Sequence, residues 1–360
     1  MRAAQAPAQR AAIALSCAPG VGRQRFRELL DAKGDAEAAF ALAVQPARRD
    51  ALLDDADHLI DSARDCGARI ACYGVAHQPD HEKSVSIAPY PERLRELDDP
   101  PSVLFLRGHD EWLSERPVVS IVGTRRATAY GERVTGDLAA QLARAGALVL
   151  SGMARGIDGA AHRGALGSGG RSGAVLGTGI DLAYPAAHQA LHAELSVNGV
   201  LVSEQLPGER ANGGSFPERN RIIAALSDIV IVIEAGKKSG ALITAARALE
   251  LGRVVAAVPG QIDSPQSAGS NELLRDGAQL IASAEDALAL AGLTLPARAP
   301  APGVGGNDRT IWDALAVGAL DLDMLASHTA LPAREVMAAV TRLELSGAVE
   351  CALTGEVRRR

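Results

Sequence analysis

Short apolar runs alternate with helical stretches through the middle of the chain. The runs are rich in β-branched residues, and most are followed by about a dozen residues with helical spacing of apolar positions. Near-continuous apolar strands that alternate with helices are typical of a parallel sheet buried on both faces. The pattern predicts an α/β fold, with a Rossmann-like, doubly wound, mostly parallel sheet whose core covers residues 115–285. The predicted strands are Val118–Val122, Ala147–Leu150, Ser172–Leu176, Val200–Ser203, Ile229–Glu234 and Val254–Val258.

An N-terminal helical region precedes this sheet. Residues 10–67 carry apolar positions at helical spacing, which predicts a SAM-like or helix-hairpin-helix-like domain over residues 1–67. The Pro19-Gly20-Val21-Gly22 segment suits a hairpin that offers backbone N–H groups to a phosphate. A plain helix–helix turn, in which glycine supplies a positive φ, is the simpler interpretation of the same residues.

A second module is expected at the C-terminal end. An extended Rossmann-like domain over residues 68–291 is followed by residues 292–308, whose Pro, Ala and Gly content predicts a flexible linker. Three helical segments and a tail with a turn at Thr354-Gly355 come next, an order typical of a winged helix-turn-helix. We therefore expect a winged-helix-like domain over residues 309–360, with helices at Arg309–Ala316, Asp321–His328 and Pro332–Ser346.

The overall charge confines any nucleic-acid site to a local patch. The 360 residues carry a formal net charge of −6, whereas proteins that coat duplex DNA are usually basic. Aromatic residues make up only 3%, which leaves few platforms for stacked bases. The four cysteines are scattered without a C-x-x-C pair, so we expect free thiols and no metal site. No apolar run reaches the roughly 18 residues that span a membrane, and we expect no membrane segment and a cytoplasmic location.

Glycines and arginines gather at the ends of the predicted strands. Because the carboxyl ends of parallel strands meet at one edge of the sheet, these residues are expected to lie together, where ligands of such sheets bind. Glycine lets a backbone approach a ligand, and arginine grips phosphate with two hydrogen bonds. Tight βα turns alone would explain some of the glycines, but not the arginines beside them. The strand-end segments are Gly123-Thr124-Arg125, Gly152 to Gly156, Gly177-Thr178-Gly179, Phe216 to Arg221, Gly240 to Thr244 and Pro259-Gly260-Gln261.

The spacing of these glycines disfavours the common phosphate cofactors. The first predicted strand is not followed by G-x-G-x-x-G, and Lys237-Lys238-Ser239 lacks the glycine spacing of a P-loop. A row of separate anion sites instead suits a ligand that repeats its phosphates, which is a single nucleic-acid strand, and we expect no cofactor. Phe216 offers one stacking face for a base, and a buried helix-entry residue is an equal interpretation of it.

The sequence gives little support for catalysis. Asp158 and His162 are four residues apart on one predicted helix and have the chemistry of a metal or acid–base pair. Capping or packing is the simpler role for Asp158, and a satisfied structural role the simpler one for His162. No nucleophile–base–orienter set is readable elsewhere, so we expect a binding protein and no enzyme.

The strand-end motifs, in this order, resemble those of the DNA-processing protein A (DprA/Smf) family. The resemblance covers about 170 residues and is far more specific than any one motif. The matching strings are YPERLRELDDPPSVLFLRG (90–108), VGTRRATAYG (122–131), SGMARGIDGAAHRGAL (151–166), AVLGTGIDLAYP (174–185), SEQLPG (203–208), FPERNRIIAALS (216–227), EAGKKSGALITA (234–245) and AVPGQ (257–261).

The resemblance implies a protein of natural transformation without enzymatic activity. Family members bind and protect incoming single-stranded DNA, form homodimers and help to load the RecA recombinase. By this resemblance the DNA strand is gripped by Arg125 and by the F-P-x-R-N-R stretch, with the glycine turns behind them. The predicted DNA- and phosphate-binding residues are Gly123, Thr124, Arg125, Gly152, Gly156, Phe216, Arg219, Asn220, Arg221, Gly240 and Thr244.

One enzymatic alternative uses the same kind of sheet. Nucleotide phosphoribohydrolases of the lysine-decarboxylase-like family carry a catalytic Glu within a P-G-G-x-G-T-x-x-E string. The corresponding stretch here, EAGKKSGALITA at residues 234–245, has no Glu after its Thr. A nucleotide-processing enzyme that uses the strand-end phosphate site is therefore the alternative to a single-strand binder, and a plain interaction scaffold is a second one.

Overall fold

A computed structural model describes residues 7–75, 88–295, 304–315, 320–352 and 355–359. The chain divides into two compact units, Met1–Pro296 and Ala297–Arg360. Within the described residues, no helix is long and apolar enough to cross a membrane. The boundary predicted at residue 67 falls inside the first unit, because the N-terminal helices share one hydrophobic core with the sheet.

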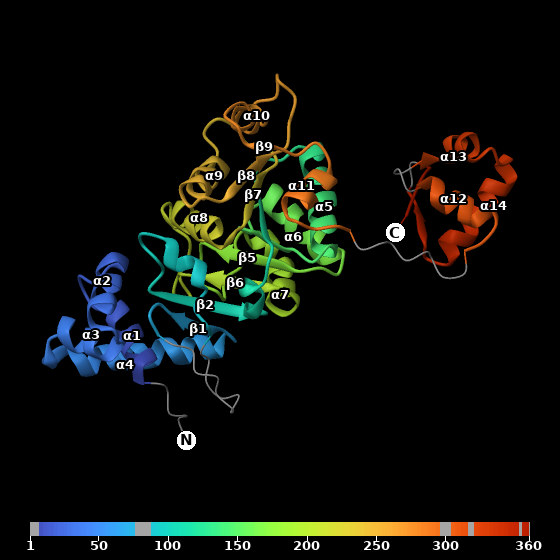
Figure 1. Cartoon of the computed structure of the whole chain (residues 1–360). Coiled ribbons are helices and arrows are strands. Elements are labelled where there is room, and N and C mark those ends of the chain that lie inside the picture. Colours follow the sequence, from blue (N-terminus) through green and yellow to red (C-terminus); the bar gives the residue numbers. More distant parts are fainter. Residues whose placement is uncertain (1–6, 76–87, 296–303, 316–319, 353–354, 360) are drawn as a thin grey trace. The chain divides into compact units, whose positions relative to one another are not determined.

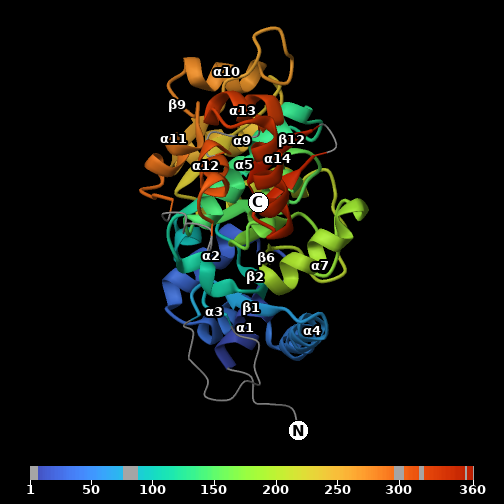
Figure 2. The same cartoon turned by 90° about the vertical axis from the view of Figure 1, so that its right-hand side faces the viewer.

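Four helices open the first unit, where the apolar spacing predicts them. Phe26, Leu29 and Leu30 form the buried stripe of the second helix, which ends at Gly34 in the left-handed conformation that glycine adopts easily. Asp35 caps the third helix by accepting a hydrogen bond from Ala38 N. The helices are α1 (Pro7–Ser16), α2 (Arg23–Lys33), α3 (Ala36–Ala43) and α4 (Pro46–Asp65). In both views they lie beside the β1–β2 edge of the sheet (Figures 1 and 2).

Within the described residues, the sheet of the first unit has nine strands in the order β1-β2-β6-β5-β4-β3-β7-β8-β9. The pairs β1–β2 and β2–β6 are antiparallel and the others parallel, which confirms the predicted mostly parallel sheet. The strands are β1 (Arg69–Cys72), β2 (Val103–Gly108), β3 (Val118–Val122), β4 (Leu148–Ser151), β5 (Ser172–Leu176), β6 (Val200–Ser203), β7 (Ile229–Val232), β8 (Val254–Ala257) and β9 (Gln279–Leu280).

Helices cover both faces of the sheet because alternate strand side chains point to opposite faces. Val119 and Ile121 pack with one set of helices, α5 (Ala129–Arg144), α6 (Ile157–Gly167) and α11 (Ala284–Leu290). Val118 and Val122 pack with the other set, α8 (Ser215–Leu226) and α9 (Gly240–Glu250), while α7 (Gln189–Asn198) lies next to α6 and packs on β2, β5 and β6 (Figure 1). The remaining elements are α10 (Ala268–Arg275) and the short 3-10 helices η1 (Glu92–Glu96), η2 (Asp110–Ser114) and η3 (Ala186–His188).

The order in which strands are added to the sheet reverses between β3 and β7. Strands β3, β4, β5 and β6 follow one another outward to one side, and the chain then returns to place β7 on the other side of β3. The two connections leave the sheet in opposite directions at this point, so a crevice opens beyond the carboxyl ends of β3 and β7. The topology thus places a ligand crevice where the sequence predicts one.

The second unit has the architecture of a small winged helix. Its helices are α12 (Asn307–Ala314), α13 (Leu322–Thr329) and α14 (Ala333–Leu345), and its sheet has the order β10-β12-β11. The strands are β10 (Leu320–Asp321), β11 (Val349–Cys351) and β12 (Glu356–Arg359). Residues 296–303 of the predicted linker lie outside the described residues. So do Ala316, Thr354 and Arg360 of the predicted winged-helix-like domain.

Candidate nucleic-acid interface

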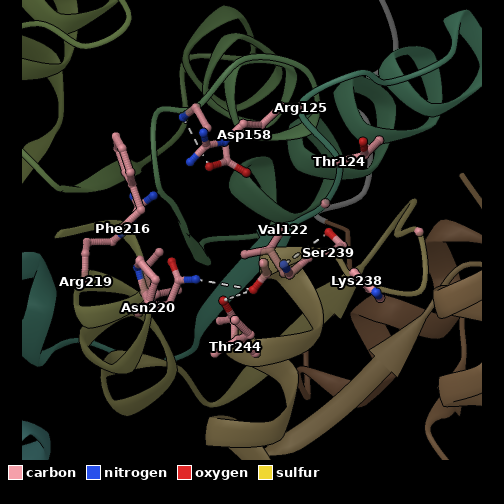
Figure 3. A pocket seen from close by; sticks show the side chains of 18 of the residues that line it. Val122, Thr124, Arg125, Asp158, Phe216, Arg219, Asn220, Lys238, Ser239 and Thr244 are labelled. Atoms are coloured by element: carbon pink, nitrogen blue, oxygen red, sulfur yellow. Dashed lines mark hydrogen bonds between the residues drawn. The ribbon is translucent and has the colours of Figure 1, made fainter. Parts of the chain in front are cut away.

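A cleft of about 760 Å³ opens at the reversal point of the sheet. It is bounded by the end of β3 and the loop after it, by one side of α8, and by the segment between β7 and α9 (Figure 3). Among its lining residues, four are cationic and one is acidic, which leaves three net positive charges in a chain of net charge −6. The five are Arg125, Lys237, Lys238, Arg219 and Asp158.

Arg125 and Phe216 form the mouth of the cleft. The Arg125 guanidinium carbon lies 4.7 Å from the centre of the Phe216 ring, a cation–π arrangement. The Phe216 ring is half-buried and packs over Gly177, where an added Cβ would lie 3.1 Å from the ring. Arg125 is exposed, and the described residues provide no ion-pair partner for it. Its charge is therefore free to meet a phosphate.

The N-terminus of α9 forms the opposite wall. Ser239 caps the helix by accepting a hydrogen bond from Ala241 N, and no acidic residue lies in the first turn. Unpaired N–H groups and the helix dipole favour an anion at such an end. The exposed side chains of Lys237 and Lys238 directly precede it and line the same cleft. Three charged or dipolar donors thus converge on one wall.

Asn220, Gly240 and Thr244 join this wall to α8. Asn220 Nδ2 donates to the Gly240 carbonyl at 3.3 Å, and Thr244 Oγ1 donates to the same carbonyl at 3.4 Å (Figure 3). All three line the cleft, as the sequence predicts, although Thr244 is buried. Their observed hydrogen bonds fix the spacing of the two helices that hold the cleft open.

Arg219 forms the buried floor of the cleft rather than its rim. The side chain is 5% exposed, and Nη1 donates to the Val175 carbonyl at the end of β5. Burial lowers the pKa of Arg219 to about 10, an effect that the nearby Asp158 carboxylate opposes. The guanidinium rests on Gly152, where an added Cβ would lie 2.0 Å from Nη1.

Gly152 and Gly156 therefore have packing roles. Gly156 has a φ of +71°, and a Cβ there would lie 2.4 Å from the Thr124 carbonyl. Neither glycine lines the cleft, where the sequence predicts direct phosphate contact by both. Gly123 does line it, and a Cβ there would lie 2.5 Å from Ile157 Cγ1, so this turn also needs glycine to bring β3 against α6.

A buried carboxylate fixes the loop that carries Thr124 and Arg125. Glu234, at 3% exposure, accepts hydrogen bonds from Thr128 N at 2.9 Å and Thr128 Oγ1 at 2.5 Å. Thr124 N donates to the Glu234 carbonyl at 2.7 Å, and Thr124 Oγ1 accepts from Arg126 N at 3.2 Å. These bonds hold the loop in one conformation, which positions Arg125 before any ligand arrives.

Asp158 and His162 are engaged in structural bonds, as the simpler interpretation of each expects. Asp158 Oδ2 accepts from Ala154 N at 3.2 Å, and burial raises the pKa of this carboxyl against the lowering effect of Arg219. His162 is fully buried and accepts from Met153 N at 3.3 Å, while its Nδ1 lies 2.9 Å from Ser172 Oγ. Burial lowers the pKa of His162 to about 3, so the ring is neutral. It holds Met153 at a φ of 56°, a conformation that costs energy for a non-glycine residue.

Arg221 lies apart from the other predicted residues. It is 6% exposed and donates two hydrogen bonds to Glu204, at 2.8 and 2.6 Å. Arg23 of α2 reaches the same carboxylate at 3.2 Å, and Asp99 lies 3.3 Å from Arg23 and 3.4 Å from Arg221. This network faces a second cavity and not the strand-end cleft. The structure therefore gives Arg221 a role in joining α8 to the N-terminal helices, where the sequence predicts DNA contact.

Three residues in or beside the cleft are not among the DNA contacts that the sequence predicts. Lys237 and Lys238 lack the glycine spacing of a P-loop, yet two adjacent lysines just before a helix that begins with glycine themselves indicate an anion site. Tyr184 lies beside the mouth, with its ring centre 5.3 Å from that of Phe216. The sequence feature that indicates it is an aromatic residue near the end of the AVLGTGIDLAYP string.

Comparison with known families assigns this architecture. Residues 84–292 match the family model of DNA recombination-mediator protein A, and residues 295–352 match that of the DprA winged helix domain. The chain belongs to the DprA/Smf family. The predicted resemblance and the predicted fold class are thereby confirmed, including the winged helix.

Similar relatives extend over most of the chain. A putative DNA processing protein DprA of Mycobacterium tuberculosis is 43% identical over 72% of this chain and 69% of its own length. The X-ray structure of DprA from Streptococcus pneumoniae matches with a TM-score of 0.63 and 32% identity, over 78% of this chain and 95% of that one. A DprA structure from Helicobacter pylori, described for its single-stranded DNA binding mode, matches with a TM-score of 0.53 and 33% identity, over 56% of this chain and 93% of that one.

Proposed function

We propose that the strand-end cleft binds single-stranded DNA and that the chain processes DNA during natural transformation. The observation that carries this proposal is the gathering of unpaired cations at one edge of the sheet. Within the described residues, Arg125, Lys237 and Lys238 have no ion-pair partner, whereas most arginines of the N-terminal and α8 regions are paired with carboxylates. Unpaired cations beside a helix N-terminus favour an anionic ligand.

The form of the site supports a strand in preference to a compact cofactor. The donors are spread over two walls, with Arg125 on one and Lys237, Lys238 and the α9 N-terminus on the other. A repeating phosphate backbone satisfies such separated donors, and an aromatic residue at the mouth suits an unstacked base. The single-stranded DNA binding mode named for the H. pylori relative supports the same ligand class.

A binding role is proposed in preference to catalysis. The two groups with acid–base chemistry, Asp158 and His162, are both buried and hydrogen-bonded to the backbone of the β4–α6 loop. His162 cannot act as a base at the cleft, because both of its ring nitrogens are engaged away from it. The family resemblance further supports homodimerisation and delivery of the bound strand to the RecA recombinase, which we include in the proposal.

The proposal is tested by the salt dependence of strand binding. In single strands, log affinity falls with log salt by about 0.7 for each neutralised phosphate. The double variant Lys237→Gln/Lys238→Gln is therefore expected to reduce the slope by about 1.4 in anisotropy titrations of a labelled oligothymidylate. The control Lys33→Gln/Arg48→Gln removes the same charge from exposed positions on the N-terminal helices. Equal slopes for the two double variants would contradict the cleft as the binding site.

The partners are tested separately. Sedimentation velocity of the full chain is expected to show a dimer. RecA ATP hydrolysis on single-stranded DNA coated with single-strand binding protein is expected to start earlier when the chain is added. A monomer at all concentrations, or an unchanged lag, would remove the corresponding partner from the proposal and leave strand binding standing.

A further inference from the structure

Beside the mouth of the cleft lies an exposed aromatic ring, Tyr184, which packs on Phe216. Tyr184 is 47% exposed, in a chain whose aromatic content is only 3%. An exposed aromatic side chain at a binding site is a typical platform for a nucleic-acid base, because every base has a π-face. Among the described residues, Tyr130 is exposed to the same degree, at 46%, but it belongs to the first turn of α5 and lines a separate cavity.

Phe216 itself has little ring surface left for a base. The Arg125 guanidinium lies over the ring at 4.7 Å, the backbone at Gly177 packs against it, and Tyr184 covers it at 5.3 Å with the planes inclined by 38°. The half-buried Phe216 therefore works as a support. Tyr184 is the ring of this group with an open surface.

The loop that carries Tyr184 is held in place from several sides. Thr178 Oγ1 donates to the Leu182 carbonyl at 2.8 Å, and Ser203 Oγ donates to the Thr178 carbonyl at 2.6 Å. Gly179 N donates to the Glu209 carbonyl at 2.8 Å, and Gly208 N donates to Asp181 Oδ1 at 2.8 Å. A rigid loop orders the ring before binding, so less entropy is lost when a base stacks on it.

We propose that Tyr184 stacks a base of the bound strand, so that the strand leaves the phosphate-binding cleft across the β5–η3 loop. This inference rests on the proposed function and adds a base contact to it. Arg125, Phe216 and Tyr184 form a continuous row from the cleft outward, each in contact with the next. Arg125 at one end of this row contacts the DNA backbone, and Tyr184 at the other end contacts a base without discriminating between bases.

The test compares two strands of equal length and charge, oligothymidylate and an abasic deoxyribose-phosphate oligomer. Stacking contributes about 1–3 kcal/mol for each base, so Tyr184→Ala is expected to weaken oligothymidylate binding about 5- to 150-fold. Binding of the abasic strand is expected to stay within about twofold, because its phosphate contacts are unchanged. Tyr184→Phe retains wild-type affinity for both strands, and the matched control Tyr130→Ala changes neither.

A Trp variant provides a second measurement, fluorescence quenching by a stacked base, which a purely structural role of Tyr184 would not produce. Tyr184→Trp is expected to bind like the wild type and to lose Trp fluorescence when oligothymidylate, but not the abasic strand, is added. An equal loss of affinity for both strands in Tyr184→Ala, or no loss for either, overturns the stacking role while strand binding stands. Absence of binding by the wild-type chain at low salt overturns the proposed function and the stacking role together.

Discussion

Arg125 and Arg221 are predicted alike from the sequence, but the structure separates their roles in a way that one pair of variants can test. Arg125 is exposed at the cleft mouth, and its guanidinium lies over the Phe216 ring. Arg221 is buried and paired with Glu204 through two hydrogen bonds. Arg125→Ala should therefore impair DNA binding without destabilising the fold. Arg221→Ala should destabilise the fold and leave the salt dependence of DNA binding unchanged.

The magnitudes follow from the contacts that each variant removes. Loss of an exposed cation–π contact costs about 0.5–1 kcal/mol, so Arg125→Ala should barely change the free energy of unfolding. Its salt slope should fall by about 0.7, and the wild-type advantage should shrink about 2.6-fold when salt rises from about 50 to 200 mM. Arg221→Ala leaves the Glu204 carboxylate, 14% exposed, with Arg23 as its remaining close cation. We expect a loss of about 3 kcal/mol, the lower end for a broken buried pair.

Two assays on both variants decide the matter. The urea-induced unfolding transition of the first unit measures stability. Anisotropy titration of a labelled strand at several salt concentrations measures the slope of log affinity against log salt. The reasoning would be refuted if Arg221→Ala kept wild-type stability and lowered the salt slope as Arg125→Ala does. That result would mean that Arg221 leaves Glu204 to contact DNA.

Two further predictions concern residues buried behind the cleft. Gly152→Ala forces Arg219 from its place, because the new Cβ would lie 2.0 Å from Nη1, and it should cost at least about 2 kcal/mol in urea denaturation. As a control, a Cβ added at Gly136 on α5 has no atom within 4 Å, so Gly136→Ala should leave the free energy of unfolding unchanged or raise it. An equal loss of stability in Gly152→Ala and Gly136→Ala would contradict the packing argument. The buried neutral His162, with its pKa lowered to about 3, binds no proton when folded, whereas the unfolded chain binds one below about pH 6.5. Its contribution to stability is complete above pH 6.5 and falls by up to about 1.4 kcal/mol for each pH unit between 6.5 and 3. His162→Asn should flatten this dependence, and an unchanged slope would mean that other groups cause it.

The sequence predicts the sheet and the position of the cleft because both follow from local patterns. Apolar runs of β-branched residues define the strands, and their order places the ends of β3 and β7 at one edge. Arg125 and Gly123 directly follow a strand, so their place at this edge follows from topology alone. These residues line the cleft as predicted.

The roles within the F-P-E-R-N-R string do not follow from the sequence. Arg219 and Arg221 are two residues apart on α8, and positions i and i+2 of a helix do not face the same side. One faces the floor of the cleft and the other faces Glu204. The string shows neither which face of α8 turns to the sheet nor that Arg23, 181 residues from Glu204, completes the ion network. Pairing over such separations depends on packing that periodicity does not contain.

The most direct test of the account is a comparison of single-stranded and duplex DNA of the same sequence in mobility-shift titrations at low and at moderate salt. The account predicts that the full chain shifts the single strand at lower protein concentration than the duplex, and that this binding weakens as salt rises. Equal affinity for both forms, or single-strand binding that does not respond to salt, would contradict a phosphate-gripping cleft for one DNA strand.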